Sequence, residues 1–280
     1  MKVVVTGAAG LVGSAVCRMS PAGVNLVGLI RNAPAPDGVK SQRVELAQRL
    51  AMFDALHRIR PDLVIHTAYD PAALQSSVVD AGAAVASACE ALGVGLIAMS
   101  TDMVFGGDSP PYDESSPPSP ITEYGRAKYA MERSVMDTDA RNTIVRSSIV
   151  VGVDPLDGAS RWCLDALRDG REVTLFHDGI RAPILVEDLA AMLWELALME
   201  PRERSGIWHL AGTEAMSRVE LGAQLCRIHR CDPAGIVSAS SSTSPLPRPK
   251  DLTLISNRAQ QLSVRPRSLS SVGEYGSAKW

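Results

Sequence analysis

The stretch Met1–Val16, MKVVVTGAAGLVGSAV, determines the fold of this 280-residue chain. Its apolar run Val3–Val5 is followed by three glycines, Gly7, Gly10 and Gly13. An apolar run, a glycine-rich turn and then apolar residues at helical spacing predict a buried strand that turns sharply into a helix.

The three glycines have separate roles in the expected turn. Gly7 can adopt a positive φ, so the chain can leave the strand sharply. Gly10 has no Cβ to block a pyrophosphate, and Gly13 lets the helix pack close to the strand. The helix then directs free N–H groups and the positive end of its dipole at the phosphates. We therefore predict a dinucleotide site formed by Gly7, Ala9, Gly10, Leu11, Val12 and Gly13.

Composition limits the class of protein. Apolar residues make up 46% of the chain, which is enough for one large α/β domain or one domain with a smaller cap. The net charge of −3 and the aromatic content of 4% give no sign of a nucleic-acid or membrane partner. Five scattered cysteines indicate reduced thiols in a cytoplasmic protein, and five histidines form no metal-ligand cluster.

No segment is expected to act as a secretory signal or to cross a bilayer. The N-terminal apolar run breaks at Thr6 and Gly7. The most apolar helical segment, Leu189–Met199, is too short to span a bilayer and is interrupted by Glu195.

Apolar runs alternate with helical patterns along the first half of the chain. Strands are expected at 24–30, 44–46, 62–68, 95–100 and 143–152, and helices at 47–60 and 74–92. This alternation predicts an α/β fold with a doubly wound parallel sheet of the Rossmann type. Residues 1–152 should form the NAD(P)-binding core, and residues 153–280 a smaller substrate-binding cap interleaved with the last core strands.

Ligands of such sheets bind at the carboxyl ends of the strands. Arg31 and Asn32 follow the second strand, where an acidic residue would bind the 2′-hydroxyl of NAD and an arginine suits the 2′-phosphate of NADP. Arg31 therefore favours NADP(H), with NAD(H) possible; the alternative for Arg31 is a solvated loop residue. The other residues expected at the cofactor are Glu45, Leu46, Thr67, Ala68 and Tyr69.

His66 stands at the end of the fourth expected strand and could act as an acid or base. Inside a buried strand, a histidine is more often a hydrogen-bonded core residue. We therefore expect a structural role.

Tyr124 and Lys128 are four residues apart and share one face of an expected helix. A lysine cation beside a phenol lowers the pKa of the phenol from about 10 toward the working pH. Such a tyrosine can protonate a carbonyl oxygen as hydride reaches the carbon, and the lysine can hold the nicotinamide ribose. Thr101, at the end of the fifth strand, is placed to orient the carbonyl, with Ser100 as the runner-up. A single Y-x-x-x-K pattern usually lies on the exposed face of a surface helix. Here it comes after the glycine turn and after the fifth strand with its Ser-Thr end, in the order that a dinucleotide-binding reductase needs.

Four segments together resemble the extended short-chain dehydrogenase/reductase family, and within it the dTDP-4-dehydrorhamnose reductase branch. They are TGAAGLVG (6–13), STDMVFG (100–106), PYDE (111–114) and YGRAKYAME (124–132). The resemblance implies a catalytic triad of Thr101, Tyr124 and Lys128. It also implies cofactor contacts from Ser100, Tyr124 and Lys128, and a homodimer through the helices 74–92 and 124–136.

The resemblance is weaker where the substrate should bind. The branch has Trp and Tyr after the equivalent of Arg146, whereas this chain has Ile149 and Val151. In the Pro/Ser-rich loop 237–250, Arg248 either reaches a nucleotide diphosphate or lies in a solvated turn, and Arg161 is a further candidate. The residues expected at the substrate are Thr101, Met103, Val104, Tyr124, Arg181 and Arg248.

The implied function is an NADP(H)-dependent reductase acting on the 4-keto group of a nucleotide-linked deoxysugar. One alternative is a reductase or epimerase for a different sugar nucleotide or a non-sugar substrate. Another is a non-catalytic NADP-binding regulatory subunit, because the regulatory β subunit of methionine adenosyltransferase resembles the same branch. Dehydration is disfavoured, because dehydratases of this fold have Asp-Glu after the catalytic Thr and this chain has Asp102-Met103.

Overall fold

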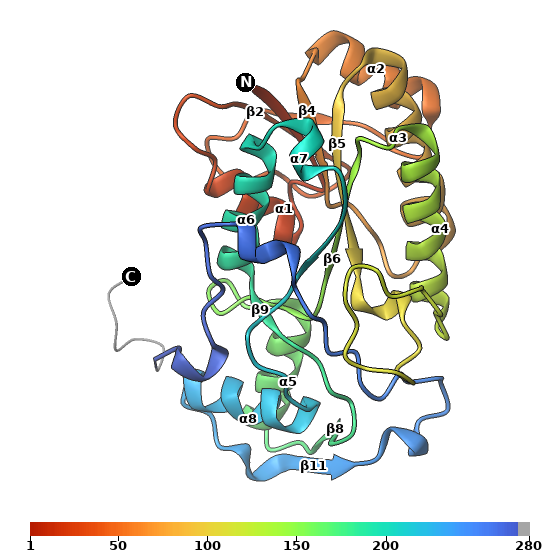
Figure 1. The fold of residues 1–280 in the computed structure, drawn as a ribbon. Coiled ribbons are helices and arrows are strands. Elements are labelled where there is room, and N and C mark those ends of the chain that lie inside the picture. The colour runs from red at the N-terminus through yellow and green to blue at the C-terminus, as the bar shows by residue number, and fades with distance from the viewer. Residues whose placement is uncertain (274–280) are drawn as a thin grey trace.

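The computed structural model describes residues 1–273 (Figure 1). Seven parallel strands form one sheet in the order β10-β6-β5-β4-β1-β2-β3. Their bounds are β1 (Lys2–Thr6), β2 (Asn25–Ile30), β3 (Ser41–Arg43), β4 (Leu63–His66), β5 (Gly95–Thr101), β6 (Thr143–Ser147) and β10 (Gly206–Leu210). The strand order reverses at β1, which creates the switch point where ligands bind in such sheets. The predicted doubly wound parallel sheet is confirmed.

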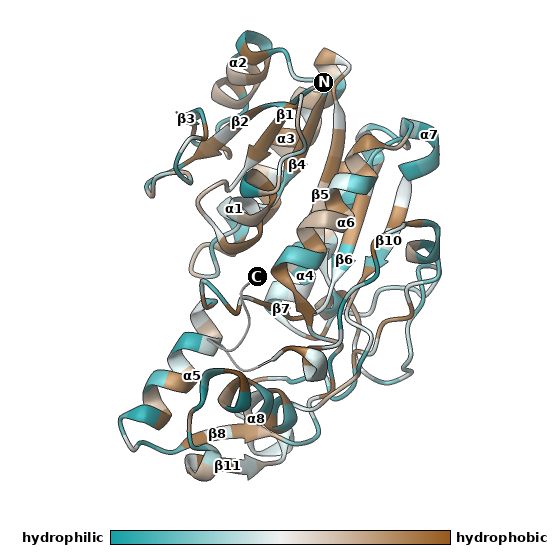
Figure 2. Cartoon of the chain, turned by 90° about the vertical axis from the view of Figure 1, so that its left-hand side faces the viewer, coloured by the Kyte–Doolittle hydropathy of each residue, from teal (hydrophilic) through white to brown (hydrophobic). Residues whose placement is uncertain are grey.

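Helices cover both faces of the sheet because its central strands are apolar on both sides (Figures 1 and 2). One face carries α1 (Leu11–Arg18) and α6 (Val186–Leu198), joined by a 2.8 Å hydrogen bond from Trp194 Nε1 to the Val16 carbonyl. The other face carries α2 (Arg49–Ile59), α3 (Ala81–Leu92) and α4 (Glu123–Thr138).

A smaller unit lies beyond the carboxyl ends of the strands, at the bottom of Figure 1. It has an apolar cluster of its own, formed mainly by the two helices α5 and α8. Its elements are α5 (Gly158–Arg168), α8 (Arg218–His229), and the paired strands β8 (Val173–Phe176) and β11 (Ile236–Ala239). Between the cap and the sheet, the short strands β7 (Val150–Val151) and β9 (Ile184–Leu185) pair with each other, and α7 (Pro201–Arg204) precedes β10.

Three local predictions were wrong. The third strand lies at Ser41–Arg43 instead of 44–46, because it pairs with β2 only up to Ile30, and Val44 packs into the core beneath α2. The strand expected at 143–152 breaks after Ser147, and its second half pairs with β9 outside the main sheet. The loop expected at 237–250 begins inside the strand β11.

Candidate active site

The carboxyl ends of the sheet strands open into one cavity of about 910 Å³. The predicted cofactor residues that line it are Gly7, Ala9, Gly10, Leu11, Val12, Gly13, Arg31, Asn32, Glu45, Leu46, Thr67, Ala68, Tyr69, Ser100, Tyr124 and Lys128. The predicted substrate residues that line it are Thr101, Met103, Tyr124, Arg181 and Arg248. The cavity therefore brings together side chains that are far apart in the sequence, from both the sheet and the cap.

The turn between β1 and α1 fits a dinucleotide pyrophosphate. Gly7 has a φ of +67°, and a Cβ on Gly13 would lie 2.2 Å from the Gly7 carbonyl oxygen, so neither position accepts a side chain without strain. Gly10 is the N-cap of α1, and it has no side chain that could bond to the first amides of the helix. The first amides of the helix are therefore open to an anion, and the helix dipole favours one there.

The adenosine end of the cavity carries opposite charges. Arg31 Nη2 lies 2.7 Å from Asp70 Oδ2, in an ion pair that the sequence did not suggest. The negative charge of Glu45 also lies close enough to raise the pKa of Arg31. Both carboxylates and the arginine line the cavity, so the charge available to a 2′-phosphate is smaller than Arg31 alone would provide.

Tyr124 lines the cavity from the first turn of α4. Burial raises its pKa above the ordinary value, with smaller contributions from Tyr69 and Asp102, while a hydrogen bond with Thr101 opposes the rise. The expectation that Lys128 lowers this pKa is therefore not met, because burial dominates. Tyr124 carries its proton at neutral pH and can donate it.

Lys128 is buried one helical turn after Tyr124. Its ammonium group donates to the Met99 carbonyl at 3.0 Å and lies 5.6 Å from the centre of the Tyr69 ring. Burial lowers the pKa of Lys128 to about 8, against the raising effect of Glu132. The Ser100 hydroxyl donates to Glu132 at 2.5 Å. The Thr101 hydroxyl makes a longer contact, 3.2 Å to Asp102 Oδ1, and is hydrogen-bonded to Tyr124, so Thr101 is the better placed of the two.

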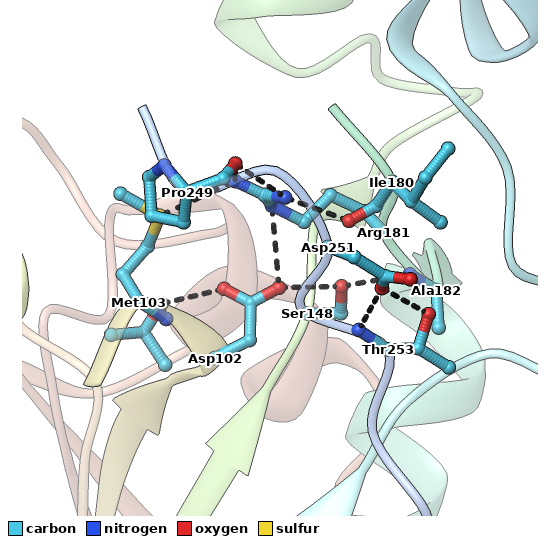
Figure 3. Close-up of polar contacts among 10 residues, drawn as sticks. Asp102, Met103, Ser148, Ile180, Arg181, Ala182, Pro249, Asp251 and Thr253 are labelled. Carbon is cyan, nitrogen blue, oxygen red and sulfur yellow. Dashed lines mark hydrogen bonds and ion pairs between the residues drawn. The ribbon is translucent and has the colours of Figure 1, made fainter. Parts of the chain in front are cut away.

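A buried carboxylate, Asp102, lies between β5 and the cap (Figure 3). Asp102 Oδ2 accepts a 2.8 Å hydrogen bond from the Ser148 hydroxyl and lies 3.7 Å from Arg181 Nε. Asp102 Oδ1 accepts from the Thr101 hydroxyl at 3.2 Å. Arg181 also donates to the carbonyl oxygen of Pro249, so this network ties Thr101 to the cap and to the C-terminal segment.

Three arginines converge at the far end of the cavity. Arg181, Arg218 and Arg248 all line it. Burial lowers the pKa of Arg218, and the cations of Arg181 and Arg248 lower it as well. The Arg248 guanidinium lies 5.7 Å from the centre of the Phe176 ring. Clustered guanidinium groups beside an aromatic ring can bind a phosphorylated group and a flat base.

Some substrate predictions need correction. Val104 is fully buried against Phe105 and lies away from the cavity, so it cannot contact a substrate. Arg161 is exposed on α5 and does not line the cavity either. Ile149 lines the cavity, whereas Val151 is buried in the cap cluster.

Sequence reasoning missed several cavity residues, namely Asp70, Asp102 as a site residue, Ser148, Phe176 and Arg218. Arg218 opens α8 directly after its N-cap Ser217, a pattern that predicts a helix start and says nothing about a ligand. His66 was predicted correctly as a core residue, because it is buried and its Nδ1 lies 2.7 Å from Thr6 Oγ1.

Within residues 1–273, no helix combines the length and apolar character that crossing a bilayer requires. The same residues contain no group of three or more His, Cys, Asp or Glu side chains arranged to hold a metal ion.

A family model described as the RmlD substrate binding domain matches residues 1–271. The chain belongs to the RmlD family. Its match covers nearly the whole chain, including the cap in which the sequence resemblance was weak.

Two relatives of this RmlD-family chain are named for different roles, one as a subunit of another enzyme and one as a reductase. The methionine adenosyltransferase 2 subunit beta of Rattus norvegicus is 26% identical over 289 residues, covering 97% of this chain and 85% of the relative. The probable low-salt glycan biosynthesis reductase Agl14 of Haloferax volcanii is 30% identical over 239 residues, covering 80% of this chain and 79% of the relative.

A solved structure shares the fold. The dTDP-4-dehydrorhamnose reductase of Bacillus anthracis, in complex with NADP, superposes with a TM-score of 0.83 at 23% identity. The match covers 96% of this chain and 95% of that one.

Proposed function

We propose that this RmlD-family chain is an NADP(H)-dependent reductase that transfers hydride to the 4-keto group of a nucleotide-linked deoxysugar. The proposal rests on one observation: Thr101, Tyr124 and Lys128 line the same cavity. The glycine turn that fits a pyrophosphate lies at one end of this cavity, and three arginines lie at the other. The named reductases among its relatives support the same reaction class.

In the proposed reaction, Tyr124 gives its proton to the carbonyl oxygen. The bound nicotinamide supplies the hydride to the carbonyl carbon. Tyr124 suits the role because burial keeps its phenol protonated until the oxygen becomes basic. Lys128 holds positive charge on the same helix face, which stabilises the phenolate that remains.

Thr101 positions the reacting oxygen in this scheme. Its hydroxyl is in hydrogen-bonding contact with Tyr124 and with Asp102 Oδ1. The Thr101 hydroxyl has one proton, so it must leave the Asp102 carboxylate to donate to the carbonyl oxygen of the substrate. Until then, the contact with Asp102 holds the Thr101 side chain beside Tyr124.

For the substrate, we propose that Arg218 and Arg248 bind the diphosphate and that Phe176 contacts the base. Arg181 is partly neutralised by Asp102, so it contributes less free charge than the other two. If so, free nucleoside diphosphates should inhibit competitively against the ketosugar nucleotide, and the free ketose should not.

For the cofactor, Arg31 at the end of β2 supports NADP(H), with NAD(H) as a possible second cofactor. A site in the carboxyl-end cavity also fits the switch point of the sheet. We further propose a homodimer through α3 and α4, which lie side by side (Figure 1), and a cytoplasmic location. Light scattering of the purified chain tests the dimer.

The direct test of the function is oxidation of NADPH with a panel of 4-keto nucleotide sugars. Consumption of NADPH with stoichiometric formation of the reduced sugar supports the reductase. Epimerised product without net NADPH consumption would favour an epimerase instead.

A second candidate is a cofactor-binding regulatory subunit. It is favoured by the methionine adenosyltransferase 2 subunit beta of Rattus norvegicus, whose match covers 97% of this chain. Tight NADPH binding without turnover of any ketosugar would support this alternative.

A further inference from the structure

An ion pair joins the two sides of the glycine turn at the adenosine end of the cavity. Arg31 directly follows β2, and Asp70 follows β4, whereas β1, which leads into the turn, lies between these strands in the sheet. The 2.7 Å contact between Arg31 Nη2 and Asp70 Oδ2 therefore spans the turn that fits the cofactor pyrophosphate.

The two partners differ in how firmly they are held. The backbone N–H of Asp70 donates to the Ser77 hydroxyl at 2.8 Å, and that hydroxyl donates back to the Asp70 carbonyl at 2.9 Å. Asp70 Oδ1 also accepts from the Ala72 amide at 3.0 Å. Arg31, by contrast, is a long side chain that is 48% exposed. Asp70 is thus a fixed acceptor, and Arg31 is the partner that can move.

We propose that Asp70 sets the cofactor selectivity of this chain by competing with the 2′-phosphate of NADP(H) for Arg31. This inference rests on the proposed nicotinamide site. NAD(H) has no 2′-phosphate, so its binding leaves the ion pair intact. NADP(H) must replace one anionic partner of Arg31 with another, next to the further negative charge of Glu45.

The competition reduces the benefit that Arg31 gives to NADP(H). A guanidinium that is already paired gains little when it exchanges a carboxylate for a phosphate. The native chain should therefore prefer NADPH over NADH only modestly, by about tenfold or less.

The test is Asp70→Asn in the full chain, with dissociation constants for NADPH and NADH measured by nicotinamide fluorescence. Asparagine keeps the size of the side chain and its acceptor for the Ala72 amide but removes the charge. We expect the dissociation constant for NADPH to fall about tenfold and that for NADH to change less than about twofold. No turnover is needed for this readout.

Asp37→Asn is the matched control, because it removes the same charge from an exposed position in the β2–β3 loop and leaves the Arg31–Asp70 pair intact. It should change neither constant. In Arg31→Gln, the Asp70→Asn change should lose most of its effect, because no guanidinium remains to be released.

The inference is overturned if Asp70→Asn changes both constants by the same factor or changes neither. It is also overturned if the gain for NADPH persists fully in Arg31→Gln. Binding of neither cofactor to the native chain would instead overturn the proposed function, so the two failures are distinguishable.

Discussion

His66 shows how a single buried residue links the site to acid stability. Its Nδ1 pairs with the Thr6 hydroxyl, which itself accepts a hydrogen bond from the Thr67 amide at 3.2 Å, so the arrangement suits a neutral ring. Burial, with a smaller contribution from the Lys128 charge, lowers the pKa of His66 to about 3. The unfolded chain takes up a proton here below about pH 6.5, whereas the folded chain does so only near pH 3.

The native chain should therefore lose stability as the pH falls through this window. His66 accounts for a loss of roughly 2 kcal/mol between pH 7 and pH 5. In His66→Gln, which keeps hydrogen-bonding groups without a titrating ring, that part of the loss should disappear. Urea unfolding of both chains at the two pH values measures it, and equal losses in both chains would contradict the assignment.

The elements differ in how well the sequence predicts them. The turn from β1 to α1 could be predicted fully, because only glycine tolerates the φ at Gly7 and the close approach at Gly13. The edge strand β3 was misplaced, because Ser41–Arg43 form a strand by pairing with β2 and not through an apolar pattern.

The substrate end could be predicted only in part. Arg181 and Arg248 were predicted from the sequence. Arg218 and Phe176 lie beside them because of how the cap packs, and no local sequence pattern indicates that packing. Val104 was wrongly placed there because proximity to Thr101 in sequence does not fix the direction of a side chain.

The packing of α1 against the glycine turn can be tested by adding a methyl group at Gly13. In Gly13→Ala, the new Cβ would lie 2.2 Å from the Gly7 carbonyl oxygen, so α1 must move away from the turn. The affinity for NADPH should fall by about tenfold or more, because the helix amides leave their position at the phosphates. Gly93→Ala is the control, since it strains the C-cap of α3, where φ is +66°, at a position that does not line the cavity. Unchanged NADPH affinity in Gly13→Ala would contradict the assigned phosphate site.

At the scale of the whole molecule, the C-terminal segment ties the cap to the sheet, running beside α6 and α7 in Figure 1. The Arg258 guanidinium donates to the carbonyl oxygens of Glu203, Ser205 and Ile207 at 2.8–3.0 Å. It also lies 4.0 Å from the centre of the Trp208 ring on β10. These contacts anchor the segment that follows Arg248 to α7 and β10.

Arg258→Ala should therefore lower the free energy of unfolding by about 2 kcal/mol, from the lost hydrogen bonds and the lost ring contact. Arg202→Ala, an exposed arginine on the neighbouring α7, should change it by about 0.5 kcal/mol or less. Denaturant unfolding of the two variants measures both. Equal stability of the two variants would show that the Arg258 contacts do not hold the segment.

Tyr124→Phe tests whether Tyr124 is the proton donor of a carbonyl reductase. The measurement is the rate of NADPH oxidation with a 4-keto nucleotide sugar, alongside NADPH affinity. Turnover should fall by about 10²-fold or more and NADPH affinity should change far less, because phenylalanine fills the same space but has no proton to give. Equal turnover in the variant and the native chain would contradict this role.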